Sequence, residues 1–330
     1  MKKNRLLLLL VLLMLFGNFF YSQNLDSLKL ALKQAKHDTT RVDLIYKIGE
    51  NEPIFRIGYW DTLKTLCENL LVLNKSKGLV HTVLLKNLSG AVNNIGYIYD
   101  DHGNIPYALE YYHMALKYSE ELKDKSSVAS IFINIGHIYD GQKNYPKALE
   151  YYNKSLVAKR ELNDKKGVAL ALNNIGGIYL NMDDYKNAMN LFTKSLNLYQ
   201  EIKNKKGIAN EINMIGGVYK NTGDIDKALE YYNESLVIRE EIQDKLGIAR
   251  SLNSIGNALL SKGKYMEAQV KAEQAMKIAK ELGYPENIHK TSNLLSKIYS
   301  KLNKFKEAYE MHVLYKEMSD SIISEANKKA

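Results

Sequence analysis

The sequence predicts an all-α fold, a solenoid in which antiparallel helix hairpins stack one after another. Two observations carry this prediction. A small residue recurs every 40 residues, preceded by Ile in all but the last copy, and the apolar residues between the copies follow helical spacing. The recurring positions are Gly96, Gly136, Gly176, Gly216, Gly256 and Ser296.

Each repeat contains two helices, as the stretch from Gly167 to Gly207 illustrates. Turns rich in helix breakers, such as 101–104 and 221–224, separate the helices, and Pro106 and Pro146 fall at the start of a second helix, where a missing amide costs little. The apolar positions are Leu172, Ile175, Ile178 and Tyr179 in the first helix and Ala188, Met189, Phe192, Leu196 and Ile202 in the second.

The chain before the repeats divides into two parts. Lys2, Lys3 and Arg5 precede an apolar run from Leu6 to Phe16, which predicts a secretory signal over 1–22 with cleavage after Ser22. The run is short for a membrane span, and an uncleaved anchor stays open as the alternative. Residues 23–78 are expected to form an N-terminal helix and a degenerate repeat around Gly49, disturbed by Pro53. The array then covers 79–315 with about six repeats, and 316–330 form a helical tail.

Composition narrows the function classes. The formal net charge of +9 falls to +6 without the three basic residues of the signal, and the recurring lysines between helices are typical of a solvated edge rather than a nucleic-acid surface. Cys67 is the single cysteine, so no disulfide can form within the chain.

These positions resemble the tetratricopeptide repeat (TPR) family. Gly96, Tyr99, Ala108, Tyr112 and Ala115 fall on the alternating small and large positions of its signature, and the period resembles the long-helix variants. The resemblance implies a right-handed superhelix whose first helices line a concave groove. The segments LDSLKLALKQAKHDTTRVDLI and YKEMSDSIISEANKKA also resemble the extracytoplasmic input region of bacterial TPR sensor histidine kinases and regulators.

No motif points to catalysis, a cofactor or a metal. The seven histidines are scattered without an HExxH pattern, and Cys67 lies in an apolar stretch. One tyrosine of each pair, such as Tyr111 and Tyr112, is a signature packing position, so core packing is the expected role. We therefore expect a protein that is not an enzyme and has no small-molecule substrate.

The first helices carry a ladder of asparagines on the face opposite the packed one. An amide both donates and accepts, so such a ladder can bind the backbone of an extended peptide. The alternative is structural: these amides bridge neighbouring helices or face water. The predicted groove residues are Asn93, Asn94, Asn134, Asn173, Asn174, Asn213, Asn253 and Asn293.

The charge along the predicted groove changes from negative in the early repeats to positive in the later ones. The acidic residues are Asp100, Asp101 and Asp140, and the basic ones are Lys220, Arg250, Lys290 and Lys297. A peptide with a basic end towards the early repeats and an acidic end towards the late ones would be complementary. The pattern departs from the carboxylate clamp that binds chaperone tails.

The sequence thus predicts an exported peptide-binding scaffold, periplasmic or extracellular, with a protein or peptide partner and no nucleic acid. The alternative is the truncated sensory input module of a signalling protein with a membrane partner.

Overall fold

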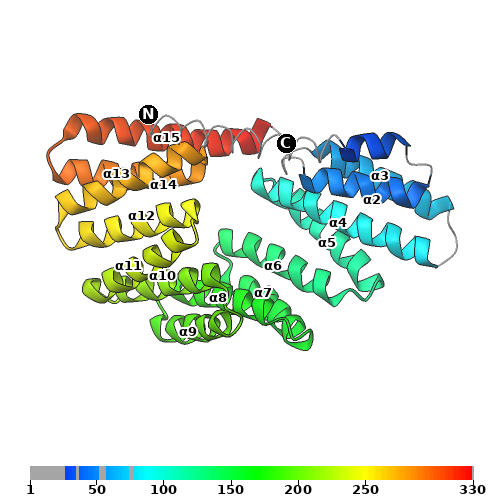
Figure 1. Ribbon diagram of the computed structural model, residues 1–330, viewed down its shortest axis with the longest axis horizontal. Helices are drawn as coiled ribbons and strands as arrows, with labels where there is room; N and C mark the ends of the chain where they lie inside the picture. The colour runs from blue at the N-terminus through cyan, green and yellow to red at the C-terminus, as the bar shows by residue number, and fades with distance from the viewer. Residues whose placement is uncertain (1–26, 35–36, 52–56, 74–77, 329–330) are drawn as a thin grey trace, which may run out of the picture. The chain divides into compact units, whose positions relative to one another are not determined.

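The computed structural model describes residues 27–34, 37–51, 57–73 and 78–328, and the predicted signal lies outside them. Every regular element in the described ranges is a helix, which confirms the predicted all-α solenoid of helix hairpins (Figure 1). After a helical stretch over 27–34, the helices are α2 (Asp38–Asn51), α3 (Ile57–Leu73), α4 (Leu79–Asp101), α5 (Ile105–Glu121), α6 (Lys125–Gly141), α7 (Tyr145–Glu161), α8 (Lys165–Asn181), α9 (Tyr185–Glu201), α10 (Lys205–Asn221), α11 (Ile225–Glu241), α12 (Lys245–Ser261), α13 (Tyr265–Leu282), α14 (Pro285–Lys301) and α15 (Phe305–Lys328).

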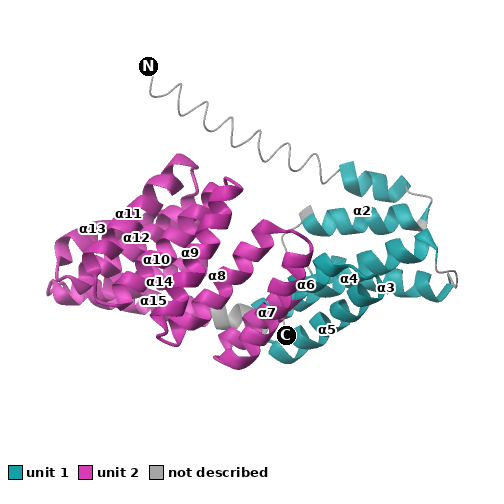
Figure 2. Cartoon of the chain, turned by 90° about the horizontal axis from the view of Figure 1, so that it is seen from below, with its two compact units in different colours: residues 1–131 teal, residues 132–330 magenta. Residues whose placement is uncertain are grey.

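The chain forms two compact units, 1–131 and 132–330, and the division falls within α6 (Figure 2). In unit 1, α4 packs against α5 and against α3. In unit 2, the two helices of each hairpin pack against each other in α8/α9, α10/α11, α12/α13 and α14/α15, and α9, α11 and α13 pack against the first helix of the next hairpin. The second helices α5 to α13 begin at residues 105, 145, 185, 225 and 265, so the helix boundaries keep the 40-residue period.

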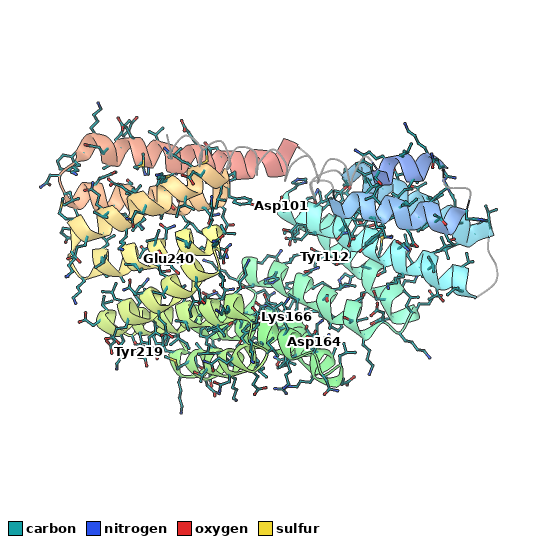
Figure 3. The ribbon with its side chains drawn as sticks, in the orientation of Figure 1. Asp101, Tyr112, Asp164, Lys166, Tyr219 and Glu240 are labelled. Atoms are coloured by element: carbon teal, nitrogen blue, oxygen red, sulfur yellow. The ribbon has the colours of Figure 1, made fainter. Side chains whose placement is uncertain are left out.

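Most turns between helices use the same two features, a residue with positive φ that ends one helix and a capping side chain that starts the next. A left-handed residue such as Asn163, with φ of 54°, closes α7. Asp164 follows, and its side chain accepts a hydrogen bond from the Gly167 amide at 2.8 Å, which caps α8 (Figure 3). A side-chain cap of this kind stabilises a helix by about 1 kcal/mol. Asp124 caps α6 in the same way, accepting from the Ser127 amide at 3.1 Å. The other caps of this type are Asn144, Asp184, Asn204, Asp224 and Asp244.

The small signature residue lets an aromatic ring approach the first helix. A Cβ added to Gly176 would lie 2.8 Å from Cε1 of Phe192, whose side chain is fully buried. Gly136 makes the same room for Tyr152. In the fifth repeat the ring is replaced by Ala272, and Gly256 faces Leu294 instead. The predicted pairing of small and large residues therefore builds the core.

Candidate functional site: the exposed face of the first helices

The first helices of the hairpins carry the predicted groove asparagines, and each of these side chains is half-buried rather than exposed. They lie on α4, α6, α8, α10, α12 and α14 as Asn93, Asn94, Asn134, Asn173, Asn174, Asn213, Asn253 and Asn293. In each unit, the face of the first helices opposite the core is thus partly covered and carries these amides.

Two of these amides bridge neighbouring first helices. Asn173 Nδ2 on α8 donates to Glu211 Oε1 on α10 at 2.8 Å, and Asn253 Nδ2 on α12 donates to Thr291 Oγ1 on α14 at 2.8 Å. In unit 1 the amide of Asn87 plays the same part between α4 and α2, donating to an Asp43 carboxylate oxygen at 3.2 Å. The structural interpretation of the ladder thus applies to Asn173 and Asn253.

Other amide atoms of the ladder have no protein partner. Asn174 Nδ2, Asn213 Oδ1 and Asn253 Oδ1 are buried and make no hydrogen bond within the described part of the chain. A buried amide atom without a partner costs about 1–3 kcal/mol. One amide nitrogen and two amide oxygens of the ladder are therefore left without a hydrogen bond among the described residues.

Glu211 is a polar core residue that the sequence analysis missed. Its side chain is 1% exposed, and burial raises the pKa of the carboxyl to about 7, although hydrogen bonds from Asn173 and Ser195 partly oppose the rise. Its Oε2 has no partner among the described residues. The repeats themselves could have singled out Glu211, because it is the one charged residue at its position in the repeat. The equivalent residues are Ala91, Ile131, Ala171, Ser251 and Thr291.

The predicted acidic residues occupy equivalent places at the ends of first helices. Asp100 precedes Asp101, the last residue of α4 in unit 1, which is labelled in Figure 3, and Asp140 lies near the end of α6 in unit 2. Burial, followed by the nearby charge of Asp101, raises the pKa of Asp100 to about 6. Burial also raises the pKa of Asp140. Both carboxyls thus hold their protons more tightly than exposed ones.

Three of the four predicted basic residues converge on one hollow between α12 and α14, which we call the α12/α14 hollow. Its volume is about 380 Å³, and no acidic residue lines it. It brings together the predicted residues Arg250, Asn253, Lys290, Asn293 and Lys297 with Ser254, Asn257, Asn287, His289 and Leu294, which were not predicted. Lys220, on α10, is not among the lining residues.

A second hollow in unit 1 has a mixed lining. It lies between α2, α4 and the start of α6, has a volume of about 620 Å³ and includes the predicted Asn93 and Asn94. Asp43 and Glu50 contribute acidic groups, and Lys47 and Lys86 contribute basic ones. These opposite charges leave the hollow without a preferred sign of ligand charge.

Three findings concern the reactivity of Cys67, metal binding and membrane insertion. Burial raises the pKa of the Cys67 thiol to about 12, so the thiolate needed for nucleophilic attack is disfavoured. Among the described residues, no three His, Cys, Asp or Glu side chains gather in the manner of metal ligands. None of the described helices combines the length and apolar character of a membrane span.

The comparisons with known proteins agree with this architecture. The tetratricopeptide repeat model matches residues 88–161, 127–201, 167–241 and 208–281, more than half of the chain, and the chain belongs to this family. As a TPR protein, it is a scaffold for protein interaction. A comparison with curated protein sequences finds no significant match.

Several solved structures share the fold at low sequence identity. The apo form of RapI has a TM-score of 0.63 and 16% identity over 83% of this chain and 94% of its own. A Rap protein complexed with Competence and Sporulation Factor has a TM-score of 0.61 and 13% identity over 93% and 95%. BtubC from P. vanneervenii has a TM-score of 0.56 and 20% identity over 69% and 92%. At these identities the likeness concerns the fold alone.

Proposed function

We propose that the protein binds an extended, acidic segment of a partner protein along the first helices of unit 2, with the acidic residues seated in the α12/α14 hollow. The observation that carries the proposal is the convergence of Arg250, Lys290 and Lys297 on a hollow whose lining includes no carboxylate. Like charges brought together repel one another, and an anionic ligand relieves that repulsion.

The cations of the hollow remain available for a ligand. Arg250 and Lys297 are exposed and make no ion pair within the described residues. Lys290 Nζ lies 2.6 Å from Glu286 Oε1, but both side chains are about two-thirds exposed. An exposed pair one helical turn apart contributes only about 0.3–0.5 kcal/mol. An incoming carboxylate therefore competes with Glu286 at low cost.

The amides of the hollow suit the backbone of the same segment. Asn253 donates to Thr291, which leaves its buried Oδ1 free to accept from a ligand N–H group. Asn293 on α14 lines the same hollow one repeat later. Such contacts are independent of the ligand's side chains, so the cations supply the preference for acidic residues.

The test uses the full mature chain and two acetylated, amidated heptapeptides, Gly-Glu-Gly-Asp-Gly-Glu-Gly and its Gln/Asn counterpart. We expect the acidic peptide to bind more tightly, and the double variant Arg250→Gln/Lys297→Gln to bind it about three- to tenfold more weakly, the size expected for two exposed charge pairs. The matched control Lys186→Gln/Lys194→Gln removes two exposed charges of α9 and should retain binding. Equal loss in both double variants, or equal binding of both peptides, would refute the proposal.

We further propose that the protein is exported, and that its scaffold serves outside the cytoplasm. This proposal is supported by the basic residues Lys2, Lys3 and Arg5 and by the apolar run from Leu6 to Phe16 that follows them. N-terminal sequencing of protein recovered from a native-like host should find a chain that begins at Gln23. Recovery of Met1 in the membrane fraction would instead indicate an uncleaved anchor.

A sensory role is the second candidate, because the segments around the array resemble those of bacterial TPR sensor proteins. A structure described as a signal transduction ATPase with a tetratricopeptide repeat sensor, from Pyrococcus horikoshii, shares the fold with a TM-score of 0.58 and 16% identity over 92% of this chain and 51% of its own. Co-purification of the full chain with a membrane histidine kinase would favour this role over a free-standing scaffold.

A further inference from the structure

Three tyrosines of unit 1 form a stack at the surface. The ring of Tyr99, on α4, lies 5.3 Å from that of Tyr107 and 5.4 Å from that of Tyr111, both on α5, with interplanar angles of 25° and 18°. Tyr107 is 51% exposed. Tyr112, the neighbour of Tyr111, is by contrast fully buried, so the two members of this tyrosine pair have different roles.

Two other repeats form the same stack with a lysine in place of the third ring. Tyr139 stacks on Tyr151 at 5.6 Å, and Lys147 Nζ lies 4.8 Å from the centre of the Tyr139 ring. In unit 2 the stack is repeated by Tyr219, labelled in Figure 3, and Tyr231 at 5.3 Å, with Lys227 Nζ 5.3 Å from the Tyr219 ring.

Tyr107, Lys147 and Lys227 occupy the same position, eleven residues after the signature glycine. The second and fourth repeats place a lysine against the stack at this position. The first repeat places the ring of Tyr107 there instead, and that ring is partly exposed. A cation over the face of an aromatic ring is held by the ring's quadrupole. The first repeat therefore lacks the internal cation that repeats two and four supply.

The surroundings of the first stack are acidic. Burial raises the pKa of Tyr99, and the nearby charges of Asp61 and Glu110 raise it further. Burial likewise raises the pKa of Tyr111, with added contributions from Asp61, Glu110 and Glu68. Lys64 is the basic group on the same side of α3, and it pairs with Glu68 at 3.4 Å. Asp61 and Glu110 are both exposed, and no ion pair is found for either among the described residues.

We propose that the surface formed by Tyr99, Tyr107, Tyr111, Asp61 and Glu110 binds an arginine or lysine side chain of a partner protein. The cation seats on the exposed side of Tyr107, and Asp61 and Glu110, whose charges act on the other two rings of the stack, balance its charge. The occupant is basic because the ring stack and the carboxylates both favour a cation, and because Lys147 and Lys227 show this chain's own stacks binding one. The proposal uses α3, α4 and α5, and it does not rest on the acidic segment proposed for the α12/α14 hollow.

The experiment follows the tyrosine ring signals of the full chain by NMR during titration with acetylated, amidated Arg-Gly-Arg, with Nle-Gly-Nle as the uncharged probe. We expect the signals of the stack to shift with the arginine peptide alone. Tyr107→Phe should retain binding and assign the Tyr107 signal. Tyr107→Leu should weaken binding about two- to fivefold, the value of an exposed cation–π contact.

Two further variants separate this site from general electrostatics. Tyr107→Lys should abolish binding, because it supplies the internal cation found in the second and fourth repeats. Tyr284→Leu, a change at a tyrosine of unit 2 that is 53% exposed, is the matched control and should leave binding unchanged. Equal binding of the norleucine peptide, or an unchanged affinity of Tyr107→Leu with a normal circular dichroism spectrum, would overturn the proposal.

Discussion

The junction of α8 with α10 and the junction of α12 with α14 share an asparagine but differ in what it meets. Asn173 donates to the carboxylate of Glu211, and Asn253 donates to the hydroxyl of Thr291, both at 2.8 Å. The Thr291 hydroxyl donates in turn to the Asn287 carbonyl oxygen at 2.7 Å, so it has a second hydrogen-bond partner. Glu211 is left with an unpartnered oxygen in the core.

This difference separates an amide that satisfies a buried carboxyl from an amide that lies at the hollow proposed to bind a ligand. In the α8–α10 junction the amide is needed inside the protein, because without it a buried carboxyl loses its donor. In the α12–α14 junction the amide is bonded to a hydroxyl with another partner, and its free Oδ1 lies beside a basic hollow. Under the proposed function, the same repeated residue serves packing in one repeat and ligand binding in another.

The largest expected contrast between the two junctions is in how they make the free energy of unfolding depend on pH. The pKa of Glu211 rises from 4.5 to about 7 on folding, so the folded state binds the proton more tightly. Its contribution to stability is complete below pH 4.5 and is lost as the pH rises through 7, a change on the order of 3 kcal/mol. Tyr199 packs nearby, but burial and Glu211 raise the pKa of its hydroxyl to about 12, above this window.

Urea unfolding at pH 5 and pH 8 measures that contrast. The parent protein should lose more stability between these values than Glu211→Gln, which has no proton to release. Thr291→Val, at the equivalent position, should keep the parent's pH dependence. An identical pH dependence in the parent and in Glu211→Gln would show that Glu211 does not titrate in this range.

A smaller contrast is expected when each asparagine is truncated. Asn173→Ala removes the amide donor of a buried carboxyl and should cost about 3 kcal/mol at pH 8, the upper end of the range for a buried group left without a partner. Asn253→Ala removes one neutral hydrogen bond, and Thr291 keeps its other bond, so about 0.5–1.5 kcal/mol is expected. Paired denaturant titrations measure both, and a larger loss for Asn253→Ala would reverse the comparison.

The smallest contrast concerns the signature glycines of the same two repeats. Gly176→Ala places a methyl group 2.8 Å from the rigid Phe192 ring, and this overpacking should destabilise the protein by about 1–3 kcal/mol. The higher helix propensity of Ala offsets about 1 kcal/mol of that loss. Gly256→Ala meets first the flexible end of Leu294 at 3.1 Å. We expect it to be neutral or stabilising in thermal unfolding. Equal melting temperatures for the two variants would show that the ring does not require the glycine.

The periodic features of the fold were predictable from the sequence. The 40-residue recurrence of a small residue, with a ring sixteen residues later in four repeats, is a pattern of local spacing, and local spacing fixes helix faces. The TPR hairpins and the buried rings Tyr112, Tyr152, Phe192 and Tyr232 follow from it. The sequence also placed the asparagines on one face, because a helical wheel needs only the residue order.

The partners of those side chains were decided by the tertiary structure. Whether Asn173 bonds a ligand or Glu211 depends on a neighbour 38 residues away, and no local pattern gives that distance. For the same reason the sequence correctly placed one tyrosine of the Tyr111–Tyr112 pair in the core, as Tyr112, but did not indicate that Tyr111 meets Tyr99 and Tyr107 at the surface. Amino-acid order determines which face a side chain is on, and the packing of adjacent helices determines which atoms on that face remain free to bind.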